Sequence, residues 1–181
     1  MSQFYQILMA GTGGQGLVSM ASSLAKAAIE EGKRVVQTQS YGVAQRGGFV
    51  SAEVLISDQE ILYQQVRKPS IILVLHGVVG QRYDQLNDVP VLYDSTLIAD
   101  KALSNWHPVP FTQLAMDLGN VKTTNMLGLG ALARVMPLVS LASLEAVARA
   151  SFKGAVADLN VRACQLGYEA AGNFAAKRVG A

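Results

Sequence analysis

Residues 5–16 read Tyr5-Gln6-Ile7-Leu8-Met9-Ala10-Gly11-Thr12-Gly13-Gly14-Gln15-Gly16, an apolar run closed by glycines. The apolar half predicts a buried strand, and the glycine half is a G-x-G-x-x-G turn. Leu17 to Glu31 follows with apolar residues at helical spacing, and Gly32 is a suitable C-terminal stop. Arg34 to Gln39 predicts a second strand. This strand–turn–helix–strand order favours a parallel pair of strands joined by a right-handed crossover.

The rest of the chain continues an α/β pattern. Phe49 to Ser57 predicts a strand antiparallel to the second one, which would make the sheet mixed. Asp94-Ser95 is suited to cap a helix over Leu97 to Leu103 or to make a contact at the edge of the site, and Pro108 and Pro110 indicate a loop. The remaining expected strands are Ile71–Leu75 and Val89–Tyr93, and the expected helices are Val78–Leu86, Phe111–Leu118, Asn125–Met136, Ser143–Phe152 and Val156–Ala176. We therefore expect one α/β domain over residues 1–181, with a helical C-terminal third.

Composition excludes several classes of protein. Of 181 residues, 50% are hydrophobic and 15% are charged, which excludes an intrinsically disordered chain and leaves a thin charged coat suited to burial against partners. The net charge of +2 comes without a Lys/Arg run, so nucleic acid is not an expected partner. The single Cys164 excludes an internal disulfide, and also an iron–sulfur cluster held by this chain alone. No apolar run approaches a membrane span, and the N-terminus lacks a charged leader, so we expect a soluble cytoplasmic protein with no membrane partner.

The glycine turn predicts a place for an anion. Glycines permit backbone angles closed to other residues, and free N–H groups at a helix N-terminus favour a phosphate or carboxylate. NAD binding would require an acidic residue at the end of the second strand, where Gln37-Thr38-Gln39-Ser40 stands instead. Three readings stay open: NAD, a tight turn that needs glycine for its geometry alone, and a phosphate-bearing ligand or a group of a partner chain.

A second glycine cluster, Ser40-Tyr41-Gly42-Val43-Ala44-Gln45-Arg46-Gly47-Gly48, follows the second strand and should stand beside the first. Arg46 suits a phosphate or carboxylate, or an ion pair within the chain. His76 and His107 have no carboxylate or cysteine nearby in sequence, and Cys164 lies within a helical stretch, so no catalytic set emerges.

The ordered set of motifs resembles the gamma subunit of 2-oxoacid:ferredoxin oxidoreductases, the family that acts on pyruvate, 2-oxoglutarate and indolepyruvate. The resemblance covers most of the chain and is closest to the 2-oxoglutarate branch around Val36 to Gly42. Besides the two glycine clusters, it is carried by Ser51-Ala52-Glu53-Val54, Ile56-Ser57-Asp58, Lys68-Pro69, Tyr93-Asp94-Ser95, Val139-Ser140-Leu141, Leu159-Asn160 and Leu166-Gly167-Tyr168.

The resemblance implies a three-layer αβα domain with a Rossmann-like mixed sheet, acting as a non-catalytic subunit. It implies alpha and beta partner chains that hold thiamine diphosphate, and a ferredoxin-like subunit with the iron–sulfur clusters. This chain would lie at the coenzyme A (CoA) end of the reaction, which yields an acyl-CoA. We assign it no catalytic residue and no metal ligand, and we expect its binding residues to be Gly11, Gly13, Gly14, Gln15, Gly16, Ser40, Tyr41, Gly42, Arg46, Gly47 and Gly48.

The sequence departs from the family pattern at one place. Val43 and Ala44 stand where the family usually has Pro and Glu, so a fixed φ angle and a carboxylate are both missing. No family role is therefore carried over to these two positions. The alternatives to the subunit are a stand-alone module that binds CoA or a nucleotide, and an NAD(P)-linked α/β enzyme.

Overall fold

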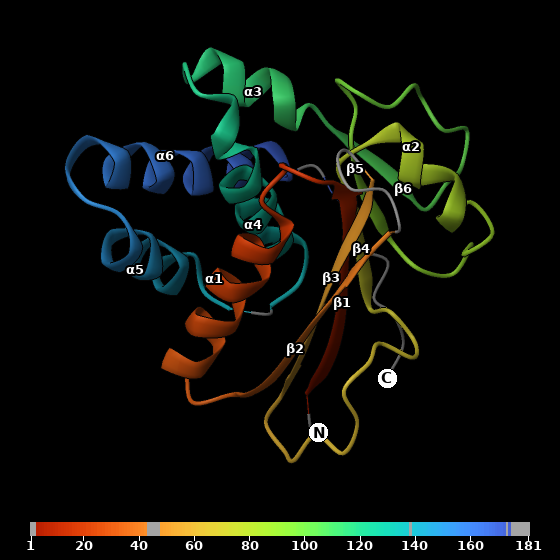
Figure 1. The fold of residues 1–181 in the computed structure, drawn as a ribbon, viewed down its shortest axis with the longest axis horizontal. Helices are drawn as coiled ribbons and strands as arrows, with labels where there is room; N and C mark the ends of the chain where they lie inside the picture. Colours follow the sequence, from red (N-terminus) through yellow and green to blue (C-terminus); the bar gives the residue numbers. More distant parts are fainter. Residues whose placement is uncertain (1–2, 43–47, 138, 173, 175–181) are drawn as a thin grey trace.

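The computed structural model describes residues 3–42, 48–137, 139–172 and 174. Its centre is a mixed six-stranded sheet with the strand order β2-β3-β1-β4-β5-β6 (Figure 1). The four strands β1, β4, β5 and β6 are parallel neighbours, whereas β3 is antiparallel to both β1 and β2. The strands are β1 (Phe4–Thr12), β2 (Arg34–Tyr41), β3 (Phe49–Ser57), β4 (Ile71–Val74), β5 (Val91–Asp94) and β6 (Trp106–Val109). The mixed α/β class predicted from sequence is confirmed.

The predicted pairing of the first two strands is wrong. β2 runs in the same direction as β1, but β3 lies between them and pairs with β1 from Phe49 to Ser57 and with β2 from Val50 to Ser57. The predicted antiparallel pairing of β2 with β3 is confirmed. The strands β2 and β3 form a hairpin, and β3 is the strand of this hairpin that lies beside β1, so β2 becomes the edge strand.

Three local predictions also differ from the structure. Pro108 lies in a strand, β6, where it pairs with Tyr93; at an edge of the sheet the missing N–H of a proline is tolerated. The helix expected over Val78–Leu86 is shorter, with a turn of α-helix, α2 (Gly77–Gly80), and a 3-10 turn, η1 (Gln81–Tyr83). No helix forms over Leu97–Leu103.

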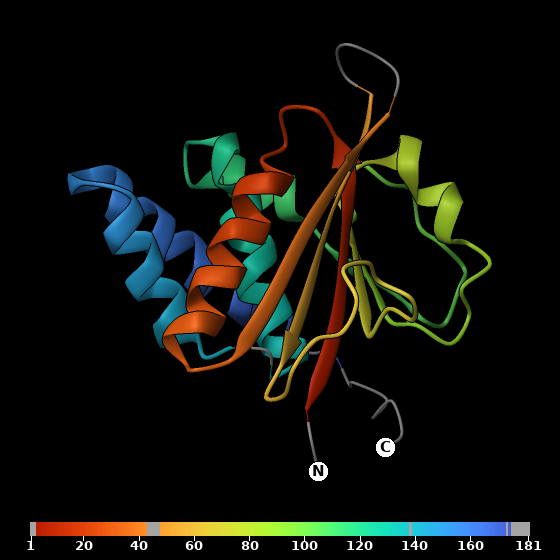
Figure 2. The ribbon, with the colours of Figure 1, turned by 60° about the horizontal axis from the view of Figure 1, so that its bottom comes forward.

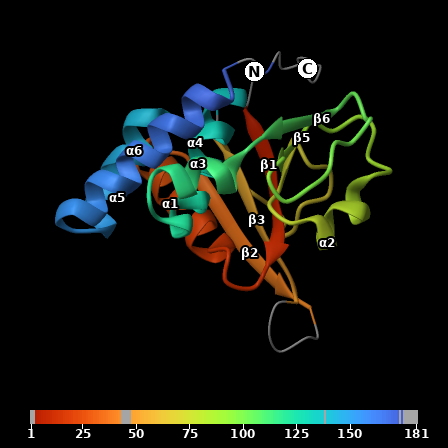
Figure 3. The ribbon, with the colours of Figure 1, turned by 90° about the horizontal axis from the view of Figure 1, so that it is seen from above.

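Helices cover the two faces of the sheet unequally, as Figures 2 and 3 show. The larger layer packs on the face that carries Ile7, Met9 and Leu73, and the smaller one, with α2, covers the face that carries Ile72 and Val74. The helices of the larger side are α1 (Leu17–Glu30), α3 (Phe111–Asp117), the 3-10 turn η2 (Val121–Thr123), α4 (Thr124–Val135), α5 (Leu141–Ser151) and α6 (Gly154–Ala170).

The three predicted helices of the C-terminal third form, with α4 and α5 close to their expected bounds, but the last one, α6, ends at Ala170 and not at Ala176. Ser140 caps α5, because its hydroxyl accepts a hydrogen bond of 3.1 Å from the N–H of Ser143. Within the described ranges, no helix has both the length and the apolar character that a membrane crossing needs.

Candidate functional site

The glycine turn joins the end of β1 to the start of α1. Gly14 and Gly16 have φ angles of 95° and 73°, in the region that L side chains rarely adopt. Around Gly14 the space is open, whereas a Cβ on Gly16 would lie 3.0 Å from the Nδ2 atom of Asn125. Both glycines are thus needed for the backbone angles of the turn. Gly16 is also needed because α4 approaches it closely.

Gln15 folds its side chain back into the protein. Its Oε1 accepts hydrogen bonds from the N–H of Thr12 (2.8 Å) and from the Thr12 hydroxyl (3.2 Å). Its Nε2 donates to the main-chain oxygen of Leu75 at 2.9 Å. The side chain therefore ties the turn to the end of β4, and the Thr12 N–H is already occupied. Gln15 holds the turn in shape, and the open N-terminus of α1 is what faces outward.

The second glycine cluster stands beside the turn, as predicted from sequence. The N–H of Gly13 donates to the main-chain oxygen of Gly48 at 3.1 Å, and the N–H of Gly42 donates to that of Phe49 at 2.6 Å. Tyr41 is 61% exposed and lines a shallow cavity of about 260 Å³ together with Gly13 and Gly14. Five residues of this cluster, Val43 to Gly47 with Arg46 among them, lie outside the described residues.

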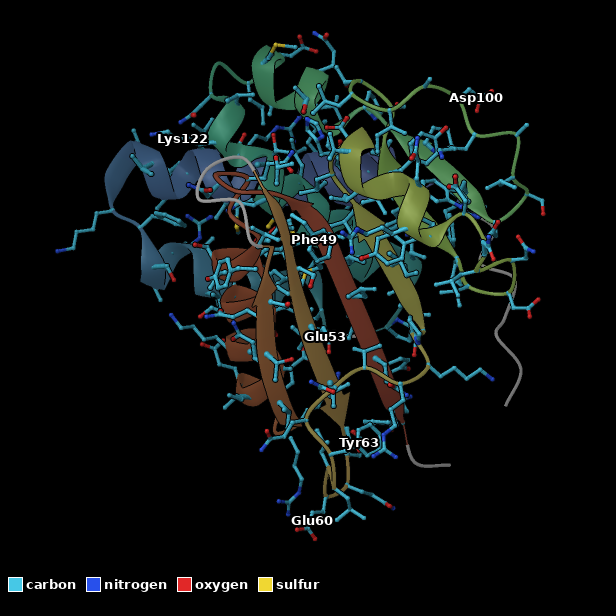
Figure 4. All side chains as sticks on the ribbon, turned by 45° about the vertical axis from the view of Figure 1, so that its right-hand side comes forward. Phe49, Glu53, Glu60, Tyr63, Asp100 and Lys122 are labelled. Atoms are coloured by element: carbon cyan, nitrogen blue, oxygen red, sulfur yellow. The ribbon has the colours of Figure 1, made fainter. Side chains whose placement is uncertain are left out.

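A larger cavity of about 520 Å³ opens on the other side of the turn. It shares Gly14, Gly16 and Ser19 with the smaller cavity, so the two meet at the N-terminus of α1. Its far walls come from η2, from the start of α4 and from the α5–α6 junction, and its polar side chains include Asn120, Lys122, Asn125 and Asn160. In Figure 4, Lys122 lies at the opposite end of the molecule from Glu60 and Tyr63.

The sequence did not single out these four residues as a site. The usable signal was asparagine inside predicted helices, because asparagine is a poor helix former. The amide of Asn160 lies in the middle of α6, and that of Asn125 lies one residue inside α4. Only the packing of α4 and α6 beside the glycine turn brings them to one cavity.

Asp94 supports the wall of this cavity. Its carboxylate is completely buried at the end of β5 and accepts hydrogen bonds from the N–H of Thr96 (3.1 Å) and from the N–H (3.1 Å) and hydroxyl (2.5 Å) of Thr112. Thr112 belongs to the first turn of α3, so Asp94 stabilises the start of that helix. The sequence assigned this carboxylate to a helix over Leu97–Leu103, which does not form.

The remaining candidate groups lie apart. His76 caps α2, since its Nδ1 accepts a hydrogen bond from the N–H of Val78, and His107 packs its ring against Phe174. Burial lowers the pKa of His107 and raises that of Cys164 to about 12. Among the described residues, no group of three His, Cys, Asp or Glu side chains is placed to hold a metal ion.

The arrangement suits binding. A helix N-terminus with open space at Gly14 favours an anion, and the cavities on its two sides could take the groups attached to that anion. The geometry is unlike that of a dinucleotide fold, because β2, whose end would carry the ribose-binding acid, is not next to β1. The fold is thus that of an α/β domain with a glycine turn at the carboxyl end of a central strand.

Comparison with known proteins gives the family. Residues 6–170 match the family described as "Pyruvate ferredoxin/flavodoxin oxidoreductase". The chain is 37% identical to 2-oxoglutarate synthase subunit KorC of Archaeoglobus fulgidus, over 90% of this chain and 86% of that one. Its sequence is 31% identical to that of the keto/oxoacid ferredoxin oxidoreductase gamma subunit of Geobacter sulfurreducens. The crystal structure of that subunit matches with a TM-score of 0.80, over 93% of this chain and 97% of that chain.

A third protein shares the fold. The 2-oxoglutarate:ferredoxin oxidoreductase of Magnetococcus marinus, solved with 2-oxoglutarate, coenzyme A and succinyl-CoA bound, has a TM-score of 0.88 at 21% identity, over 96% of this chain and 32% of that much longer chain. This chain belongs to the pyruvate ferredoxin/flavodoxin oxidoreductase family, as a gamma subunit of its multi-subunit enzymes. The resemblance noted from sequence is confirmed.

Proposed function

We propose that this gamma subunit serves an oxidoreductase that converts 2-oxoglutarate to an acyl-CoA, and that its own part is to hold CoA. Two relatives named KorC, 37% and 34% identical, support 2-oxoglutarate as the 2-oxoacid. Thiamine diphosphate would be held by alpha and beta subunits, and iron–sulfur clusters would lie on a ferredoxin-like subunit. The Magnetococcus marinus enzyme, which contains this fold and was solved with CoA bound, supports a role for CoA in the reaction.

The observation that carries the proposal is the meeting of two cavities at the start of α1. Gly14, Gly16 and Ser19 line both of them. CoA has phosphates in its middle, a nucleotide at one end and a thiol-bearing arm at the other. A phosphate at this helix N-terminus would be stabilised by the helix dipole and by main-chain N–H groups. A long ligand centred there could reach into both cavities.

The second glycine cluster would contribute the nucleotide side. Tyr41 presents an exposed ring at the smaller cavity, suited to stacking on a base. Ser40 and Gly42 flank it, and Gly48 is tied to Gly13. We also propose that Arg46, next to Gly47, pairs with a CoA phosphate, because a guanidinium binds phosphate in a bidentate manner.

The test uses the enzyme reconstituted from this chain and its partner subunits. Gly14→Asn places a side chain in the open space where the phosphate would sit. Gly32→Asn is the matched control, since Gly32 also has a positive φ (77°) and open surroundings but lies at the other end of α1. We expect Gly14→Asn to raise the KM for CoA about tenfold, or ~1.4 kcal/mol of binding energy, and Gly32→Asn to leave it unchanged.

Substrate and partners are tested in the same preparation. We expect 2-oxoglutarate to be oxidised in preference to pyruvate and indolepyruvate, with ferredoxin as electron acceptor. A CoA KM that is equal in both glycine variants would contradict the binding role. A nicotinamide-dependent reaction of the purified chain alone would favour the NAD(P)-linked alternative instead.

A further inference from the structure

We propose that the larger cavity binds secondary amides, and that it holds the pantetheine arm of CoA between Asn125 and Asn160. This inference rests on the proposed function and deepens it. The cavity, of about 520 Å³, lies within the range of small-molecule sites. Gly14, Gln15 and Gly16 also line this cavity, but neither asparagine belongs to the glycine motifs.

The orientation of the Asn160 amide follows from its main-chain partner. Asn160 is only 6% exposed, and its Nδ2 donates a hydrogen bond of 2.8 Å to the oxygen of Val156, one turn earlier in α6. Because a carbonyl oxygen can only accept, the nitrogen must face it, which turns Oδ1 the other way. This Oδ1 accepts no hydrogen bond from any residue in the described ranges, although Asn160 lines the cavity. Because Oδ1 is not among the buried side-chain atoms that lack a partner, it is open to the cavity and can accept a hydrogen bond from a bound ligand.

Asn125 has the opposite arrangement. Its Oδ1 accepts a hydrogen bond of 2.8 Å from the N–H of Met126, so its Nδ2 is the free end of the amide. This Nδ2 lies beside Gly16, where a Cβ would come within 3.0 Å of it. No described residue accepts a hydrogen bond from it. The cavity therefore offers one fixed donor and one fixed acceptor.

A secondary amide has the complementary pair, an N–H and a carbonyl oxygen. The pantetheine arm carries two such amides on a flexible chain that also bears two methyl groups. Apolar side chains of Leu97, Val121, Phe152 and Val156 form the other walls of the cavity and suit the aliphatic parts. Lys122, exposed at the rim and without an ion pair to any described side chain, suits the phosphate from which the arm starts.

The experiment measures equilibrium binding to the reconstituted enzyme by calorimetry, with three probes: CoA, pantetheine, and adenosine 3′,5′-bisphosphate. Asn125→Leu removes the free donor at similar volume without placing a charge beside the glycine turn. Asn160→Leu removes the free acceptor, and the Val156 oxygen keeps its helical partner. Asn87→Leu, on the exposed loop before β5, is the control.

We expect both cavity variants to weaken CoA and pantetheine about tenfold, which is the loss of one net hydrogen bond, and to leave the bisphosphate unchanged. Thermal unfolding of each variant, compared with that of the wild type, checks that the subunit is still folded. Unchanged pantetheine binding in both variants, or an equal loss with the bisphosphate, would overturn the inference. If Gly14→Asn weakens CoA and the asparagine variants do not, this inference fails alone; if Gly14→Asn also has no effect, the proposed function fails.

Discussion

The side-chain nitrogen of Gln15 donates a hydrogen bond of 2.9 Å to the main-chain oxygen of Leu75, 60 residues further along the chain. The other end of the same amide accepts from Thr12, so one side chain joins β1, the glycine turn and the end of β4. It also explains Gly11, because a Cβ there would overlap Gln15 Oε1. The shape of the turn is thus set by a contact across the sheet as well as by its glycines.

Replacing Gln15 by leucine should lower the free energy of unfolding by about 2 kcal/mol, because Thr12 N–H and Leu75 oxygen both lose a partner. Urea titration of the purified subunit measures this loss. Gln59→Leu, at an exposed position, is the control and should stay within about 0.5 kcal/mol of the wild type. Equal stability of the two variants would show that the bonds of Gln15 contribute nothing net.

The pH dependence of stability should contain a contribution from Glu31. Burial raises the pKa of this carboxyl, but hydrogen bonds from Ser140, Ser143 and Lys33 outweigh burial and lower the pKa from 4.5 to about 2. A lowered folded-state pKa stabilises the protein above pH 4.5, and this stabilisation is lost as the pH falls from 4.5 towards 2. Glu31→Gln should therefore be less stable at neutral pH and lose less on acidification.

Denaturant titrations between pH 7 and pH 3 test this prediction. Glu30→Gln is the matched control, since Glu30 is the neighbouring residue, is exposed and makes no ion pair with a described residue. If both variants follow the same pH profile, the network around Ser140 does not stabilise the folded chain.

The crossing of α4 and α6 should depend on Gly130. A Cβ at this position would overlap the main chain of α6 at Cys164, and main chain cannot move aside without parting the helices. Gly130→Ala should therefore destabilise the protein by about 3 kcal/mol, although alanine favours a helix by about 1 kcal/mol.

Gly128→Ala, two residues earlier in α4, is the matched control. Its Cβ would meet the ends of the Met20 and Leu73 side chains at 3.0 Å, and these can shift. Thermal or urea unfolding compares the two variants. The prediction is wrong if Gly130→Ala is no less stable than Gly128→Ala.

Cys164 should be unreactive in the folded protein. The residue is fully buried, and burial, together with the charge of Glu145, raises the pKa of its thiol to about 12. Since the thiolate is the reactive form, Ellman's reagent at pH 8 should label it only when the chain unfolds. Because the chain has one cysteine, labelling against urea concentration should follow the unfolding curve. Rapid labelling without urea would contradict the burial.

Local patterns predicted most of the helices and strands. The helix after the glycine turn begins at Leu17 as expected, because periodic apolar residues and a flanking glycine are local signals. The strand at Trp106–Val109 was missed, since an edge strand with a proline resembles a loop in sequence. The order of the strands also depended on a long-range choice: β3 could pair with β2 alone or insert beside β1.

The site divides in the same way. Gly14 and Gly16 could be predicted because a turn with positive φ angles requires glycine, and the G-x-G-x-x-G motif shows this locally in the sequence. No sequence pattern assigned Asn125 and Asn160 to a ligand site, because they are 35 residues apart in the chain and come together only through helix packing.

The sequence by itself determined the class of fold, the glycine turn and the family resemblance, since these depend on short-range periodicity, backbone preference and the order of motifs. Only the tertiary structure decided that β3 separates β1 from β2, that Gln15 is turned inward onto Leu75, and that two asparagines face one cavity. The physical reason is that hydrogen-bond partners far apart in the chain are selected by packing, and a side chain's direction depends on which partner it finds.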